Sequence, residues 1–161
     1  MREMQVSILM GSKTDLTTVE DTAKVLRDFE INFEIKVLSA HRTPKETALY
    51  AEEARGRGIK IIICAAGGSA ALAGVVAAHT SLPVIGIPVD STSLHGMDAL
   101  LSTVQMPPGV PVGTVAIGKM GAKNAAFLAL RILALSDKII EKKLEKYKED
   151  QRQEILKIKL N

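Results

Sequence analysis

The residues best suited to chemistry form the run SAHRTP at positions 39–44, which directly follows the apolar-rich run at residues 33–38. Histidine carries a proton near neutral pH. Arginine offers a planar fork that matches a phosphate group. The serine and threonine hydroxyls, and the amide end of a helix that Pro44 opens, add further donors for an anion. This set of groups indicates acid–base chemistry on a phosphorylated small molecule, with His41 and Arg42 as its central side chains.

Apolar runs and helix-like segments alternate along the chain, and these elements must position residues 39–44. Strands are predicted at residues 6–10, 33–38, 60–64, 83–89 and 112–117. Helices are predicted from Thr14 or Asp15 to about 29, from 44 to about 55, from 69 to about 80, from 96 to 104, from 123 to 135 and from 136 to 159. Such alternation predicts an α/β fold, in which helices cover both faces of a parallel sheet and the crossovers are right-handed.

Every motif with chemical potential lies directly after a predicted strand. The loops concerned are residues 11–15, 39–43, 66–69 and 90–98. In a sheet of this kind the ligand site lies beyond the carboxyl ends of the strands, near the point where the strand order reverses. We therefore expect these four loops to contribute to one site.

Two glycine-containing turns each have two interpretations. The turn at residues 11–15 is either an ordinary capped turn into a helix, or it binds phosphate through Ser12 or Thr14 while Asp15 takes ribose hydroxyls. It has neither the Gly-Lys-Ser/Thr ending of a P-loop nor the three-glycine spacing of a dinucleotide site. Gly67 and Gly68 either allow close packing of helix on strand, or leave bare backbone beside a flat ligand or carbon dioxide.

The remaining candidate residues carry weaker predictions. His79 ends a predicted helix and is expected to be a cap or surface residue. His95 lies in a loop near the predicted site, and the sequence assigns it no role. Cys64 is the single cysteine and lies in an apolar run, so a core position in a reducing compartment is expected. No spacing of histidine, cysteine and acidic residues predicts a metal site.

Composition limits the class of protein. A chain of 161 residues with 47% hydrophobic residues predicts one globular domain with a substantial core. The net charge is +3, but the basic residues near the end alternate with acidic ones and aromatics are only 3%, so no nucleic-acid partner is expected. Charges at Arg2 and Glu3 argue against a signal peptide, and no uninterrupted apolar stretch has membrane-spanning length. A cytoplasmic protein with no membrane partner is therefore expected.

The last predicted helix is amphipathic and follows the final strand and helix of the domain. Its apolar positions are Ile139, Ile140, Leu144, Tyr147, Ile155, Leu156 and Ile158. With no surface left to cover in its own domain, such a helix is expected to pack on a neighbouring subunit. The chain then divides into a catalytic domain at residues 1–135 and a C-terminal helical arm at residues 136–161.

Taken together, the motifs resemble one enzyme family. The runs GSKTDL (11–16), SAHRTP (39–44), AAGGSAA (65–71), LPVIGIPV (82–89), residues 94–118 and GAKNAAFLALRIL (121–133) are similar to the N5-carboxyaminoimidazole ribonucleotide mutase and aminoimidazole ribonucleotide carboxylase family of purine biosynthesis, the PurE family. The resemblance covers about residues 6–135. It implies a flavodoxin-like three-layer α/β/α sandwich, a homo-octamer with sites at subunit boundaries, and no metal or organic cofactor.

The resemblance also implies a reaction. The family moves a carboxyl group between an exocyclic nitrogen and a ring carbon of aminoimidazole ribonucleotide, so the expected partners are that ribonucleotide and carbon dioxide or bicarbonate. His41 matches the family's general acid and base, and a closed pocket would retain carbon dioxide. By the same match the substrate is bound by Gly11, Ser12, Thr14, Asp15, Ser39, Ala40, Arg42, Ala66, Gly67, Gly68 and Ser69.

Three positions depart from the mutase pattern. Ala71 stands where mutases carry histidine, Ala73 where they carry proline, and Ala99 where the family usually has serine. Ala71 cannot donate a hydrogen bond to a carboxylate, although the stretch VQMPPG at residues 104–109 is mutase-like. Three interpretations therefore stay open: a mutase, a direct carboxylase or its reverse decarboxylase, and a non-catalytic nucleotide-binding relative.

Overall fold

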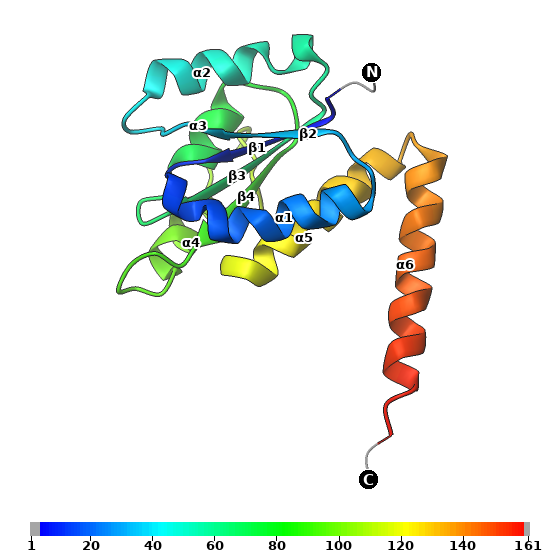
Figure 1. Ribbon diagram of the computed structural model, residues 1–161. Coiled ribbons are helices and arrows are strands. Elements are labelled where there is room, and N and C mark those ends of the chain that lie inside the picture. Colours follow the sequence, from blue (N-terminus) through cyan, green and yellow to red (C-terminus); the bar gives the residue numbers. More distant parts are fainter. Residues whose placement is uncertain (1–3, 160–161) are drawn as a thin grey trace.

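The computed structural model describes residues 4–159. Residues 1–3, part of the amino terminus where no signal peptide is expected, and residues 160–161 of the predicted arm lie outside the described residues. A parallel five-stranded sheet forms the centre of the molecule (Figure 1). Its strands are β1 (Val6–Met10), β2 (Phe33–Val37), β3 (Ile61–Gly67), β4 (Val84–Val89) and β5 (Gly113–Thr114). Their spatial order is β2-β1-β3-β4-β5, so the order reverses between β1 and β3.

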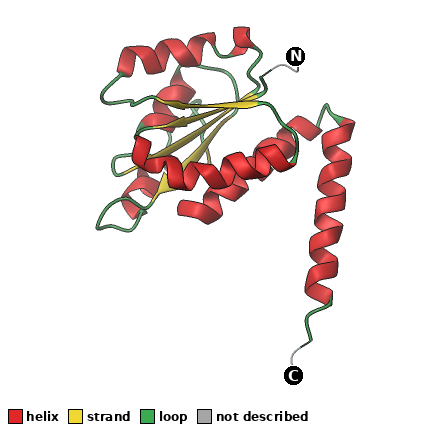
Figure 2. Ribbon diagram, in the orientation of Figure 1, coloured by secondary structure: helices red, strands yellow, loops and turns green. Residues whose placement is uncertain are grey.

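Helices cover both faces of this sheet, as the alternating pattern predicts (Figures 1 and 2). The helices are α1 (Leu16–Asp28), α2 (Pro44–Glu53), α3 (Leu72–Ala78), α4 (Met97–Val104), α5 (Gly118–Ala134) and α6 (Lys138–Leu156), with short 3₁₀ turns η1 (Lys13–Asp15) and η2 (Arg55–Arg57). Helices α1 and α5 pack on one face, and α2 and α3 pack on the other. The predicted three-layer α/β/α architecture is confirmed. Among residues 4–159, no helix combines the length and apolar composition that a membrane span requires.

Alternate strand residues face the two cores. Ile8 and Ile63 lie in the core under α1 and α5, whereas Leu9, Ile62 and Cys64 lie in the core under α2 and α3. Burial raises the pKa of the Cys64 thiol far above its usual range, so the cysteine is an inert core residue, as predicted. Because α5 presents mainly alanines to the sheet, its backbone approaches closely without large side chains in between.

The predicted bounds of four elements were wrong. Strand β3 continues to Gly67, because Gly67 still pairs with Val89, and α3 therefore begins at Leu72 rather than near residue 69. Strand β5 spans two residues rather than 112–117: the chain makes one further ladder bond from Val115 and then leaves the sheet. Helix α5 begins at Gly118, five residues before its predicted start, because a glycine with φ of 68° turns the chain into the helix.

Helix α6 has two parts with different surroundings. In the first part Ile140 is only 4% exposed, and Tyr147 packs edge-on against Phe29 and close to Phe127. This part therefore does have a surface to cover in its own domain, contrary to the sequence-based expectation. The second part projects away from the sheet, and Ile155 and Leu156 are 67% and 63% exposed (Figure 1).

A buried polar cluster holds α2 on the sheet. The Tyr50 hydroxyl donates to Glu34 Oε1 at 2.5 Å and contacts Ser7 Oγ at 2.5 Å, and Arg57 Nη2 donates to the same Glu34 oxygen at 2.6 Å. Burial, and then the hydrogen bond to Glu34, raise the pKa of Tyr50 to about 12. The phenol therefore stays protonated at neutral pH and remains a donor. This cluster fixes α2, and so fixes the loop at residues 39–43 that precedes it.

We expect Tyr50→Phe to lower the free energy of unfolding by about 1–3 kcal/mol, since it leaves the fully buried Ser7 hydroxyl without its partner. Chemical denaturation followed by circular dichroism measures this loss. Tyr147→Phe is the matched control, because the Tyr147 hydroxyl contacts only the exposed Gln151 amide. Equal losses in the two variants would contradict the role given to the buried cluster.

Candidate functional site

A cavity of about 310 Å³ lies at the carboxyl ends of the strands, where the sheet order reverses. All four predicted loops contribute to it. Its lining residues are Gly11, Ser12, Thr14, Asp15, Ser39, Ala40, His41, Arg42, Ala66, Gly67, Ser69, Ala70, Ala71, Leu72 and Ser91. The structure thus brings together every predicted site residue except Gly68.

The turn after β1 is held by its own side chains. Ser12 Oγ accepts from the Thr14 amide at 3.3 Å and from the Thr14 hydroxyl at 2.9 Å, while the Ser12 amide donates to Asp15 Oδ2 at 3.0 Å. Burial raises the pKa of Asp15, against the opposing effects of the Ser12 amide and the Arg42 charge. The turn is therefore both a helix cap and a rigid wall of the cavity, so the two interpretations of this motif are compatible.

The loop after β2 closes on itself and presents His41 and Arg42. Ser39 O accepts from the Thr43 amide at 2.8 Å, and the Thr43 hydroxyl accepts from the Ser39 amide at 2.9 Å. Arg42 Nη2 donates to Gly11 O at 2.7 Å, which ties this loop to the turn after β1. His41 is exposed and makes no hydrogen bond or ion pair with any residue between 4 and 159. Its imidazole is therefore available to a ligand in the cavity.

The loop after β3 contributes mainly backbone. Gly67 is in close contact with Ser91, because a Cβ atom built on Gly67 would overlap Ser91 Oγ. Gly68 has a φ of 60° and reverses the chain, so it shapes the loop without lining the cavity. Sequence reasoning named neither Ser91 nor Ala70 and Leu72 as site residues, although Ser91 lies in the loop at 90–98 that was predicted to reach this edge.

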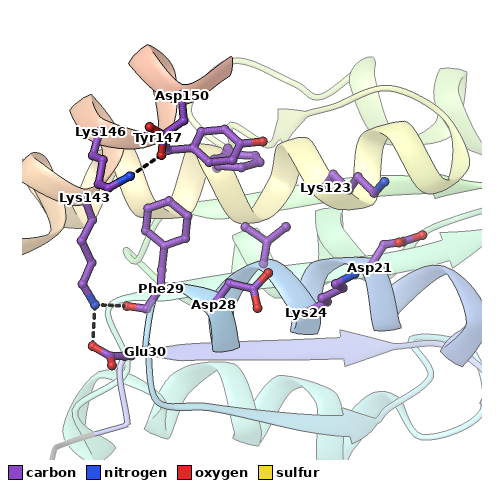
Figure 3. A pocket seen from close by; sticks show the side chains of 12 residues that line it. Asp21, Lys24, Asp28, Phe29, Glu30, Lys123, Lys143, Lys146, Tyr147 and Asp150 are labelled. Carbon is purple, nitrogen blue, oxygen red and sulfur yellow. Dashed lines mark hydrogen bonds and ion pairs between the residues drawn. The ribbon is translucent and has the colours of Figure 1, made fainter. Parts of the chain in front are cut away.

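A larger cavity of about 580 Å³ lies between α1, α5 and α6 (Figure 3). Its walls carry both charges, and two of its lysines are already paired: Lys143 Nζ lies 2.5 Å from Glu30 Oε2, and Lys146 Nζ lies 2.5 Å from Asp150 Oδ2. It shares no lining residue with the smaller cavity at the carboxyl ends of the strands, and none of its lining residues is a histidine. The smaller cavity is therefore the candidate site for chemistry.

Comparison with known proteins identifies the family of this chain. A family model described as AIR carboxylase matches residues 5–154. This chain belongs to the AIR carboxylase family. It is 55% identical over 148 residues to the N5-carboxyaminoimidazole ribonucleotide mutase of Pyrococcus abyssi, covering 92% of this chain and 84% of that protein. It is 52% identical to the mutase of Saccharolobus solfataricus, covering 97% and 98%.

Solved structures of the family have the same fold. A crystal structure of Treponema denticola PurE superposes with a TM-score of 0.86 at 35% identity, covering 96% of this chain and 95% of that one. A crystal structure of a substituted variant of the same organism's PurE2 gives a TM-score of 0.87 at 34% identity, with the same coverage of both chains. The family resemblance and the fold predicted from sequence are both confirmed.

The other two histidines of the chain lie away from the cavity. His79 caps the end of α3 and its Nδ1 lies 3.0 Å from Glu52 Oε1, consistent with the predicted cap. His95 is exposed, has a φ of 51°, and its Nδ1 lies 4.0 Å from Asp90 Oδ1. Within residues 4–159, no group of three or more histidine, cysteine or acidic side chains has an arrangement that could hold a metal ion.

Ala71, which the sequence resemblance sets against a histidine of the mutases, lines the cavity. Its methyl group cannot donate a hydrogen bond, so any carboxylate bound nearby must find another donor. His41 is therefore the single histidine among the described residues that line the cavity.

Proposed function

We propose that this protein is an N5-carboxyaminoimidazole ribonucleotide mutase of purine biosynthesis. The observation that carries the proposal is the unpaired imidazole of His41 in the cavity, in a chain that the family model matches over residues 5–154. Relatives that carry this name are 49–55% identical and align over more than nine-tenths of this chain. The reaction moves a carboxyl group from the exocyclic nitrogen of the ribonucleotide to a carbon of its imidazole ring.

His41 balances the protons of this transfer. Breaking the carbamate releases carbon dioxide and requires a proton on the exocyclic nitrogen, which His41 donates. The ring carbon then attacks the carbon dioxide, and its hydrogen leaves as a proton to His41 when the ring becomes aromatic again. The enzyme returns to its starting protonation state, so a single acid–base group is sufficient. The cavity must keep carbon dioxide beside the ring between the two steps.

The other site residues bind and orient the ribonucleotide. Arg42 Nη2 donates to Gly11 O and Arg42 Nε donates to Ser39 Oγ at 3.4 Å, so Nη1 is the guanidinium nitrogen that is available to the phosphate. Ser12, Thr14 and Ser39 supply hydroxyls beside it, and Asp15 takes ribose hydroxyls. The backbone of Ala66 and Gly67 lies beside the imidazole base. These assignments follow the family match and the position of each residue on the cavity wall.

Ala71 supports a second candidate function. An enzyme without an imidazole at this position could take free carbon dioxide as a direct aminoimidazole ribonucleotide carboxylase, or run the reverse decarboxylation. The test supplies the carbamate substrate alone, or aminoimidazole ribonucleotide with bicarbonate, and follows the ultraviolet absorbance of the carboxylated product. Product from the carbamate supports the mutase. Product only from bicarbonate would favour the carboxylase, and no product from either would refute both forward reactions and favour the reverse decarboxylase.

We further propose that the enzyme is a cytoplasmic homo-octamer whose copies meet on exposed apolar surfaces. One such surface is an apolar stripe on α4 and the loop before it. Its side chains are 48–60% exposed and are spaced three and four residues apart: Leu94, Met97, Leu101 and Val104. The stripe directly follows the loop that carries Ser91, so a second copy packed there would also border the cavity. The second part of α6 provides another such surface.

We expect the double variant Ile155→Glu, Leu156→Glu to weaken assembly, because both side chains are exposed and nothing in their own domain covers them. Light scattering should show a lower mass at equal protein concentration. Lys157→Glu introduces a glutamate at the same helix end without removing an apolar side chain, and serves as the control. A double variant with unchanged mass would contradict the packing of α6 on a neighbouring subunit.

A further inference from the structure

Ser91 occupies an unusual position on the wall of the cavity. It lies two residues after the end of β4, and its hydroxyl lies against the backbone of Gly67 at the end of β3. Gly67 does not have a left-handed φ, so the backbone angle does not require glycine there. The requirement comes from space: a Cβ atom on Gly67 would overlap Ser91 Oγ and lie 3.2 Å from Val89 O. The missing side chain at Gly67 is what allows Ser91 to reach the cavity.

The loop that carries Ser91 is held in one conformation. The Thr92 hydroxyl donates to Asp98 Oδ2 at 2.7 Å and accepts from the Leu94 amide at 3.1 Å, and Thr92 O accepts from the His95 amide at 3.1 Å. The hydrogen bond from Thr92 is the main reason that the pKa of Asp98 lies below its usual value. These bonds fix the residue next to Ser91, so the serine is positioned before any ligand arrives.

The Ser91 hydroxyl is itself unused by the protein. It is exposed to the cavity and forms no hydrogen bond with any residue that the structure describes. Across the same cavity Ala71 offers no donor where related mutases carry histidine. A migrating carboxylate bound beside the backbone of Ala66 and Gly67 would therefore find Ser91 as its adjacent donor.

We propose that Ser91 donates a hydrogen bond to the carboxylate of the ribonucleotide and replaces the donor that Ala71 lacks. This inference rests on the proposed function, because it names the group that binds the carboxyl end of that substrate. Ser69 also lines the cavity, but it lies in the turn beyond Gly68, whereas Ser91 touches Gly67. A hydrogen bond to a charged carboxylate contributes enough to change affinity about tenfold or more.

The test compares Ser91→Ala with Ser93→Ala, a matched control in the same loop whose side chain lies outside the cavity. Calorimetry measures the dissociation constants of the carboxylated product and of aminoimidazole ribonucleotide, which lacks the carboxylate. Circular dichroism melting confirms that both variants are folded. In Ser91→Ala we expect the product to bind about tenfold more weakly or worse, with unchanged binding of aminoimidazole ribonucleotide and an equal loss of kcat/KM for the carbamate.

Ser93→Ala should match the unmodified enzyme in every measurement. Unchanged product binding in Ser91→Ala, or an equal loss for both nucleotides, would overturn the role of Ser91 while leaving the mutase assignment intact. An unmodified enzyme that binds neither nucleotide and forms no product would instead refute the proposed function.

Discussion

Replacing His41 with asparagine is expected to lower kcat for carboxyl transfer by about 10²–10⁴-fold. Asparagine preserves the size and polarity of the side chain but cannot carry a proton between the exocyclic nitrogen and the ring carbon. Because His41 makes no hydrogen bond or ion pair within residues 4–159, its loss leaves the loop at 39–43 in place. The dissociation constant of the carboxylated product should therefore change far less than kcat.

His79→Asn is the control for this experiment. His79 is also partly exposed and also lies at the end of an element, but its partner is Glu52 and it does not line the cavity. Its kcat should stay near that of the unmodified enzyme. Turnover that survives in His41→Asn would remove the proposed acid–base group, and a parallel loss in His79→Asn would point to a general effect on folding.

The second large effect is expected from Arg42→Met, which should raise KM about 100-fold with a smaller change in kcat. Methionine keeps much of the aliphatic stem and removes the charged fork that we propose binds the phosphate. It also removes the bond from Arg42 to Gly11 O, so the loops after β1 and β2 lose one direct connection. Steady-state kinetics at several substrate concentrations separates the two constants.

Arg55→Met tests whether any lost cation has the same effect. Arg55 is an exposed arginine whose Nη2 donates to Ser81 Oγ at 3.0 Å, away from the cavity. We expect its KM to be unchanged. If Arg42→Met lowers kcat strongly at unchanged KM, the phosphate role of Arg42 is wrong and the residue acts on the chemical step instead.

The position of the candidate site could be predicted from the sequence, because the carboxyl ends of parallel strands lie at one edge of the sheet. Residues 11–15, 39–43 and 66–69 are far apart along the chain, yet each follows a buried apolar strand. Parallel strands place all their carboxyl ends at one edge of the sheet, so the loops must meet there once the alternation of strand and helix is recognised. Side-chain type then marks this edge, because His41 and Arg42 lie in the loop between β2 and α2.

Contacts between side chains that are far apart along the chain could not be predicted from the sequence. The proximity of Ser91 to Gly67 depends on the register of β3 against β4, in which Gly67 pairs with Val89. No local pattern encodes that register. For the same reason the sequence did not reveal that Tyr147 packs with Phe29 and Phe127, and α6 was expected to have no surface in its own domain.

The predicted bounds of β5 and α5 were also wrong, for a physical reason. Strand β5 is short because the chain turns at Gly118 into a helix that packs against β4. The apolar run at 112–117 fits a strand equally well when it is considered without that tertiary contact.

The most direct test of the account uses carbamate substrate whose carboxyl carbon carries a heavy isotope, supplied with excess unlabelled bicarbonate. Mass spectrometry of the product shows where the new carboxyl group originates. We predict that the label is retained, because carbon dioxide released in the cavity is captured by the ring before it can exchange with solvent. Product that carries the unlabelled carbon of bicarbonate would contradict direct transfer and make the enzyme a carboxylase.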